Sequence, residues 1–66
     1  MPYINVKLFE ARLDADTESR LLSALTDAVV SVYGEAIRKA TWVTIEGVPH
    51  SRWGFGGRVA PTPPTG

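Results

Sequence analysis

The stretch Pro2-Tyr3-Ile4-Asn5-Val6-Lys7-Leu8 decides the fold of this chain. Apolar and polar side chains alternate along it, with Ile4, Val6 and Leu8 on one side and Tyr3, Asn5 and Lys7 on the other. A period of two residues is the pattern of a half-buried β-strand. Pro2 stands at the start of this strand directly behind Met1, and an initiator methionine before a small residue is usually removed in cells. Its removal would leave an anchored secondary amine, a group that can carry acid–base or nucleophilic chemistry.

Size and composition limit how the fold can be stabilised. The chain has 66 residues, of which 44% are hydrophobic, with no cysteine and one histidine. A single domain of this size buries only about 60% of its unfolded surface and is marginally stable by itself. These residues can build neither a disulfide framework nor a conventional zinc site, so we expect no metal. Burial against other copies remains, and we predict a homo-oligomer.

Charge and hydropathy exclude several classes of partner. Seven basic residues balance seven acidic ones, which argues against binding to nucleic acid. The apolar runs are far too short to span a bilayer, and no signal peptide precedes the first strand. We therefore expect no membrane partner and a cytoplasmic location.

An amphipathic helix is predicted over residues 17–33, because apolar side chains recur there at three- and four-residue spacing. They are Leu21, Leu22, Leu25, Ala28, Val29 and Val32. Asp14, Asp16 and Thr17 are all suitable N-caps, and the sequence does not select one of them. Asp14 and Thr17 are not expected to form a capping box. Gly34 is expected to end the helix as a left-handed cap.

A second strand is predicted over residues 41–46, which alternate again and are rich in β-branched and aromatic side chains. Strand, helix and strand in this order form a β-α-β unit with parallel strands and a right-handed crossover. Residues 47–50 are expected to form a turn, and the glycine-rich residues 53–59 a short hairpin.

The predicted fold class is therefore α/β (α+β), with a single domain over residues 1–59. Residues 60–66 hold three of the five prolines. They form a Pro-rich tail, either an extended arm on a neighbouring copy or a disordered segment.

Taken together, these features resemble the 4-oxalocrotonate tautomerase family. The matching residues are Pro2 behind Met1, the strand over residues 3–8, Arg12 just past it, the single helix, Glu46 at the end of the second strand, and the aromatic-Gly-x-Gly-Gly run over residues 53–57. The resemblance implies that two chains pair into a four-stranded sheet and that three such dimers make a hexamer. It also implies a cofactor-independent isomerase that moves a proton between carbon and oxygen in a small enol or dienol acid.

The resemblance also assigns roles to particular residues. Pro2 would be the general base, and Arg12 would bind a substrate carboxylate and draw electron density. Trp53, with Leu8, would contribute to the apolar substrate-binding surface. The family's second arginine falls on Thr41 in this chain, and the nearby Arg38 and Lys39 are candidates to replace it in binding substrate.

Plainer roles are open for the same residues. Pro2 is tolerated at the start of an edge strand, where its missing N–H does no harm. Arg12 can be a solvated loop charge or an interface ion pair, and Trp53 can be interface packing. His50 is expected to be a turn residue, because one histidine without a serine or cysteine partner makes no nucleophilic triad.

Two alternative functions remain beside the tautomerase. One is a non-catalytic scaffold subunit, which the missing second arginine favours; if Met1 is retained, the Pro2 nitrogen is an amide and cannot act as a base. The other is a haloacrylate dehalogenase or hydratase. That chemistry needs a carboxylate to position water, and residues 53–57 offer none.

Overall fold

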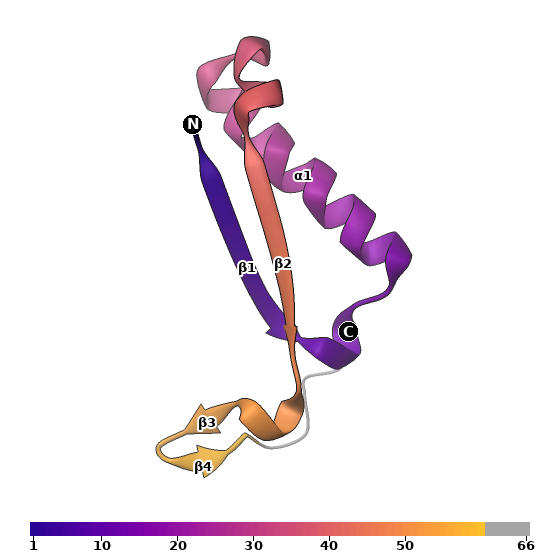
Figure 1. The fold of residues 1–66 in the computed structure, drawn as a ribbon, viewed down its shortest axis with the longest axis vertical. Coiled ribbons are helices and arrows are strands. Elements are labelled where there is room, and N and C mark those ends of the chain that lie inside the picture. The colour runs from indigo at the N-terminus through magenta and orange to yellow at the C-terminus, as the bar shows by residue number, and fades with distance from the viewer. Residues whose placement is uncertain (61–66) are drawn as a thin grey trace.

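The predicted β-α-β unit is present in the structure, a computed structural model that describes residues 1–60. Strand β1 (Tyr3–Phe9) is followed by helix α1 (Ala15–Tyr33) and strand β2 (Trp42–Val48). The helix lies along one face of the two-stranded sheet, and the opposite face is open (Figure 1). Of the predicted tail only Ala60 falls within the described residues; residues 61–66 lie outside them.

The two strands are parallel, with Tyr3 opposite Trp42 at one end and Phe9 opposite Val48 at the other. Along both strands, half-buried side chains on the helix face alternate with exposed ones on the open face. This is the period-two pattern that the sequence predicts. The alternation therefore fixes which face of the sheet the helix covers.

Strand β2 is longer than predicted, because Gly47 and Val48 belong to the strand and not to a turn. These two residues continue the pairing with Leu8 and Phe9 of β1, and Gly47 also allows a close approach of the chain between β1 and α1. A Cβ at Gly47 would lie 3.0 Å from Leu13 Cδ1 and 3.3 Å from Glu10 Cα. Packing therefore favours glycine here, because a Cβ would be crowded, and the glycine does not signal a turn.

Helix α1 begins two residues earlier than predicted, and its N-cap is Asp14. The Asp14 carboxylate accepts a hydrogen bond of 2.8 Å from the Thr17 N–H, and the Thr17 hydroxyl accepts one of 2.9 Å from the Asp14 N–H. The expectation that these two residues form no capping box was wrong. The usual motif has Glu or Gln at the third helical position, but a threonine hydroxyl accepts the same backbone bond.

We expect the Asp14 cap to make helix stability depend on pH. The hydrogen bonds from the Thr17 N–H and hydroxyl lower the pKa of Asp14 in the folded chain. A lowered pKa adds stability above the unfolded-state pKa, and this stability is lost as the pH falls below about 4 through the folded-state value. Asp14→Ala should lower the midpoint of thermal unfolding by a few degrees at neutral pH, measured by far-UV circular dichroism at fixed chain concentration.

The matched control is Asp14→Asn, which keeps an acceptor at the cap but does not titrate. It should unfold close to the wild-type temperature at neutral pH and lose less stability than the wild type on acidification. The same acid dependence in the Asn variant would show that other carboxylates dominate.

The connections are short and partly helical. Gly34 follows the last residue of α1 as its C-cap, as predicted. Its φ of 97° is positive, but its ψ of 167° is extended, so the cap is not the left-handed one expected. A 3-10 helix, Glu35–Ala40, leads into β2. After a further 3-10 helix at His50–Arg52, β3 (Gly54–Phe55) and β4 (Arg58–Val59) form the predicted antiparallel hairpin.

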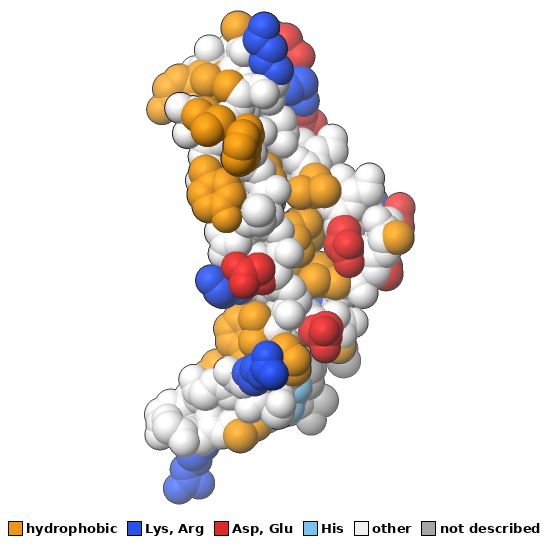
Figure 2. All heavy atoms as spheres, viewed as in Figure 1, with side chains coloured by type: hydrophobic (Ala, Val, Ile, Leu, Met, Phe, Trp, Pro, Cys, Tyr) orange, Lys and Arg blue, Asp and Glu red, His pale blue; other side chains and the backbone are white. Residues whose placement is uncertain are grey.

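A single chain builds almost no core. Among residues 1–60, only Ala60 is buried, at 2% exposure. Tyr3 and Trp42 are each 59% exposed, and hydrophobic side chains gather where β1 and β2 begin (Figure 2). Within the same residues, no helix has the length and hydropathy needed to cross a membrane. The described chain thus leaves large apolar side chains uncovered.

Candidate functional site

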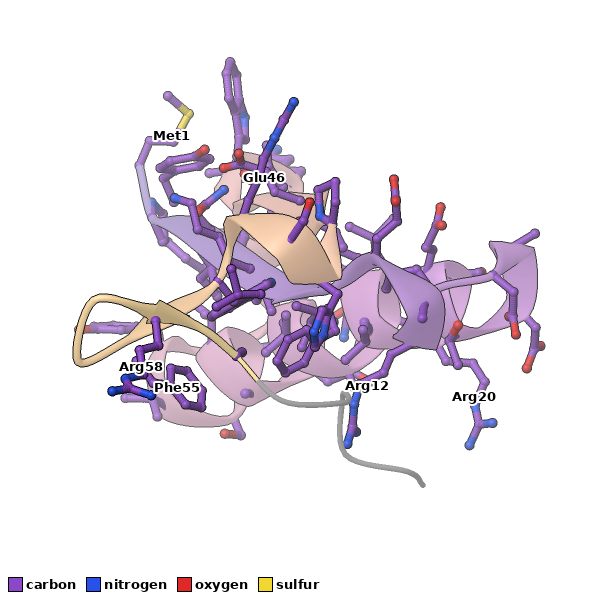
Figure 3. All side chains as sticks on the ribbon, turned by 90° about the horizontal axis from the view of Figure 1, so that it is seen from below. Met1, Arg12, Arg20, Glu46, Phe55 and Arg58 are labelled. Carbon is purple, nitrogen blue, oxygen red and sulfur yellow. The ribbon has the colours of Figure 1, made fainter. Side chains whose placement is uncertain are left out.

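The parallel pairing brings the starts of β1 and β2 to one end of the sheet. The candidate residues there, which we call the Pro2 end, are Pro2, Arg38, Lys39 and Thr41. The Trp42 N–H donates a hydrogen bond of 2.9 Å to the Pro2 carbonyl oxygen, which anchors Pro2 to the neighbouring strand. Pro2 is half-buried, whereas Met1 is 80% exposed and projects from the chain (Figure 3). An exposed Met1 in front of an anchored Pro2 is accessible to an aminopeptidase.

Arg38 is held in an ion cluster with two acidic side chains. Its Nε and Nη2 donate to the two carboxylate oxygens of Glu35 at 2.7 and 3.3 Å, and its Nη1 donates to Asp27 Oδ1 at 2.8 Å. Hydrogen bonding to Arg38 lowers the pKa of Glu35. The bonds to Glu35 and Asp27 raise the pKa of Arg38 further above its ordinary value. The guanidinium therefore ties the 3-10 helix Glu35–Ala40 to α1.

The two other residues of this end differ in how they are held. Thr41 is half-buried, and its hydroxyl donates a hydrogen bond of 2.9 Å to the Ile37 carbonyl oxygen. Lys39 is exposed and makes no ion pair with any residue of the described chain. An open depression of about 530 Å³ lies beside it, lined by Glu35, Ala36, Arg38 and Lys39. Lys39 is thus the more available cation of the predicted pair.

The remaining candidates, Leu8, Arg12 and Trp53, lie at the other end of the sheet, which we call the Arg12 end. Arg12 closes the 3-10 helix Glu10–Arg12 directly after β1. The Trp53 indole N–H donates a hydrogen bond of 3.1 Å to the Val48 carbonyl oxygen, and its ring centroid is 4.7 Å from that of Phe9. Arg12 projects from the side of the molecule opposite Glu46 (Figure 3).

His50 belongs to this end as well, and sequence reasoning did not connect it with the site. Its ring stacks on Phe9, with centroids 6.2 Å apart and 27° between the planes. The His50 Nδ1 atom is buried and has no hydrogen-bond partner. No sequence signal links Phe9 to residues 50–53, because the contacts join segments that are far apart in the chain. Phe9, His50 and Trp53 together form an aromatic cluster at the Arg12 end.

A family model described as a tautomerase enzyme matches residues 2–61. The chain belongs to the tautomerase family. No curated protein matches the chain, and no solved structure matches it. Membership indicates isomerase activity of the tautomerase type in general. The match begins at Pro2 and includes both ends of the sheet.

The open face of the tautomerase sheet carries a polar network. Asn5 Nδ2 donates to Thr44 Oγ1 at 2.7 Å and to Glu46 Oε1 at 2.8 Å. Tyr3 and Thr44 share a hydroxyl–hydroxyl bond of 2.7 Å, and Lys7 Nζ lies 3.6 Å from Glu46 Oε1. Glu46 thus accepts one hydrogen bond and makes one ion pair within the sheet. Within residues 1–60, no group of three His, Cys, Asp or Glu side chains could hold a metal.

The tautomerase chain does not bring all of its candidate residues together. The Pro2 end and the Arg12 end are separated by the seven residues of β1, which span about 23 Å. The Pro2 end holds Pro2, Arg38, Lys39 and Thr41, and the Arg12 end holds Arg12, Leu8 and Trp53. A small acid cannot touch both Pro2 and Arg12 of one chain.

Proposed function

We propose that this tautomerase interconverts the enol and keto forms of a small 2-hydroxydienoate or phenylenolpyruvate-like acid without a cofactor. Pro2, freed by removal of Met1, is the general base, and Arg12 binds the substrate carboxylate. The observation that carries the proposal is the anchoring of Pro2. The Pro2 carbonyl oxygen accepts a hydrogen bond from the Trp42 N–H, and the proline ring precedes the first residue of β1. The family match begins at this residue.

The proposed chemistry moves one proton and changes no other atom. The prolyl nitrogen accepts the proton of the enol hydroxyl as the carbonyl forms, and the protonated nitrogen then delivers that proton to the carbon of the enol double bond. A base is most effective when its pKa is near the operating pH. An apolar site and a nearby guanidinium both disfavour the protonated amine and lower its pKa.

Arg12 suits the second role because its planar fork matches a carboxylate and stays charged at all relevant pH values. Bound to the acid, it also stabilises the negative charge that develops next to the carboxylate as the proton leaves. Trp53 and Leu8 would provide the apolar wall beside it. Hydrogen bonding to Val48 and contact with Phe9 hold the Trp53 ring in one orientation.

The proposed site is completed by a second copy of the chain. One chain holds Pro2 and Arg12 at opposite ends of β1, so the Pro2 end of one copy must meet the Arg12 end of another. The uncovered Tyr3 and Trp42, and the scarcity of buried side chains, support such association. A homohexamer built from three dimers is the assembly that we propose, following the family resemblance.

A scaffold subunit without activity is the alternative that one observation favours. Arg38 is occupied by Glu35 and Asp27, and Thr41 stands where the family resemblance places a second arginine. The cationic groups at the Pro2 end are therefore fewer than a dicarboxylate-binding enzyme needs. Activity of the trimmed protein distinguishes the two functions.

Trimming is the experiment that tests the base directly. We expect protein without Met1, verified by mass spectrometry, to accelerate ketonisation of phenylenolpyruvate followed by ultraviolet absorbance. A version with one lysine inserted between Met1 and Pro2 keeps its methionine and has an amide nitrogen at the proline. Its rate should be lower by a factor of about 100 or more, because general-base catalysis contributes at least that factor. Equal rates for both proteins would favour the scaffold.

A further inference from the structure

The charge balance at the two ends of the sheet differs. At the Pro2 end, the positive charges of Arg38 and Lys39 are equal in number to the carboxylates of Asp27 and Glu35, and both carboxylates pair with Arg38. At the Arg12 end, the segments Glu10–Arg12 and 50–59 carry three arginines against one glutamate. The Pro2 end is therefore neutral, whereas these two segments, taken without the acidic first turn of α1, carry a net positive charge.

Within the ion cluster, the charge of Arg38 is more than compensated. The cluster has one guanidinium and two carboxylates, with N···O distances of 2.7 and 2.8 Å. A further carboxylate that approaches Arg38 meets a net negative charge, and Lys39 next to it only restores neutrality. The large exposed side chains where the strands begin are aromatic, Tyr3 and Trp42, which pair across the sheet.

We propose that the Asp27–Arg38–Glu35 cluster makes this tautomerase selective for enol acids with one carboxylate and an uncharged remainder. The inference rests on the proposed function. The single carboxylate binds Arg12, and the other part of the substrate lies at the neutral, aromatic Pro2 end of the partner copy. A second carboxylate finds no unmatched guanidinium there, so its desolvation is not offset.

The test compares two acids that differ only in a second carboxylate, phenylenolpyruvate and its para-carboxy derivative. We expect kcat/KM to be about tenfold higher for phenylenolpyruvate, the size of one charge-assisted hydrogen bond. The double variant Asp27→Asn, Glu35→Gln releases Arg38. It should raise kcat/KM for the para-carboxy acid about fivefold or more and leave that for phenylenolpyruvate within twofold.

The matched control is Asp16→Asn, Glu18→Gln, which removes the same charge at the far end of α1 and should leave the ratio unchanged. Equal or better turnover of the para-carboxy acid by the wild type overturns the selectivity and leaves the proposed function standing. If the cluster variant folds and its ratio of kcat/KM for the two acids equals that of the wild type, the role of the cluster in selectivity is likewise overturned and the proposed function stands. Turnover of neither acid overturns the proposed function, and the selectivity with it. A wild-type ratio of one or less overturns the proposal even if the cluster variant does not fold.

Discussion

Replacing Pro2 with alanine should lower kcat/KM for ketonisation of phenylenolpyruvate by a factor of about 100, with Met1 removed from both proteins. The alanine variant also has a free amine, but it lacks the ring that fixes the direction of the nitrogen lone pair. Its backbone can rotate where the proline ring cannot. The loss should appear mainly in kcat, because Pro2 carries the proton in the transition state and binds the ground-state acid only weakly.

The control for this result is Tyr3→Phe, one residue further along β1 and on the open face of the sheet. It removes the bond of 2.7 Å to the Thr44 hydroxyl but does not touch the proline nitrogen. Its kcat should stay within about threefold of the wild type, the effect of losing one exposed neutral hydrogen bond. Comparable losses in both variants would mean that the strand, and not the amine, is what the reaction needs.

The regular elements were predictable because their patterns are local. Alternation over residues 3–8 and the helical spacing over residues 17–33 each appear within a few turns of chain. Their order is enough for a parallel β-α-β unit. The end of β2 was not predictable, because Gly47 and the following residues have the composition of a turn. The close approach of Glu10 and Leu13 to Gly47 depends on tertiary packing.

The candidate site was predictable only as a set of residues. The family resemblance selects Pro2 and Arg12, and their roles stay predictions. The occupation of Arg38 could not be inferred, because Asp27 lies 11 residues away and is brought near by the packing of the 3-10 helix on α1. Likewise, His50 joins Phe9 and Trp53 through contacts between separate segments. Sequence spacing carries no signal for either arrangement.

A mixture of two inactive variants is expected to recover activity, and this is the sharpest test of a site shared between copies. Pro2→Ala removes the base, and Arg12→Ala removes the carboxylate ligand, each at a cost of about 100-fold in kcat/KM. When the chains are unfolded together and refolded as mixed assemblies, some sites combine an intact Pro2 from one chain with an intact Arg12 from another. For random mixing in equal amounts, about a quarter of the sites are intact, since each of the two residues comes from the right chain half of the time.

Recovery to about a quarter of wild-type activity cannot arise if Pro2 and Arg12 act within one chain, because every chain in the mixture is defective. The control mixture pairs Pro2→Ala with a chain that carries both substitutions. It assembles in the same way but contains no intact Pro2, so its activity should not exceed that of the Pro2→Ala variant. Native mass spectrometry must show mixed assemblies in both samples. Mixed assemblies without recovery would contradict the shared site. We expect recovery because a strand of about 23 Å separates Pro2 from Arg12 in one chain, so a single chain cannot place both residues on the same small acid.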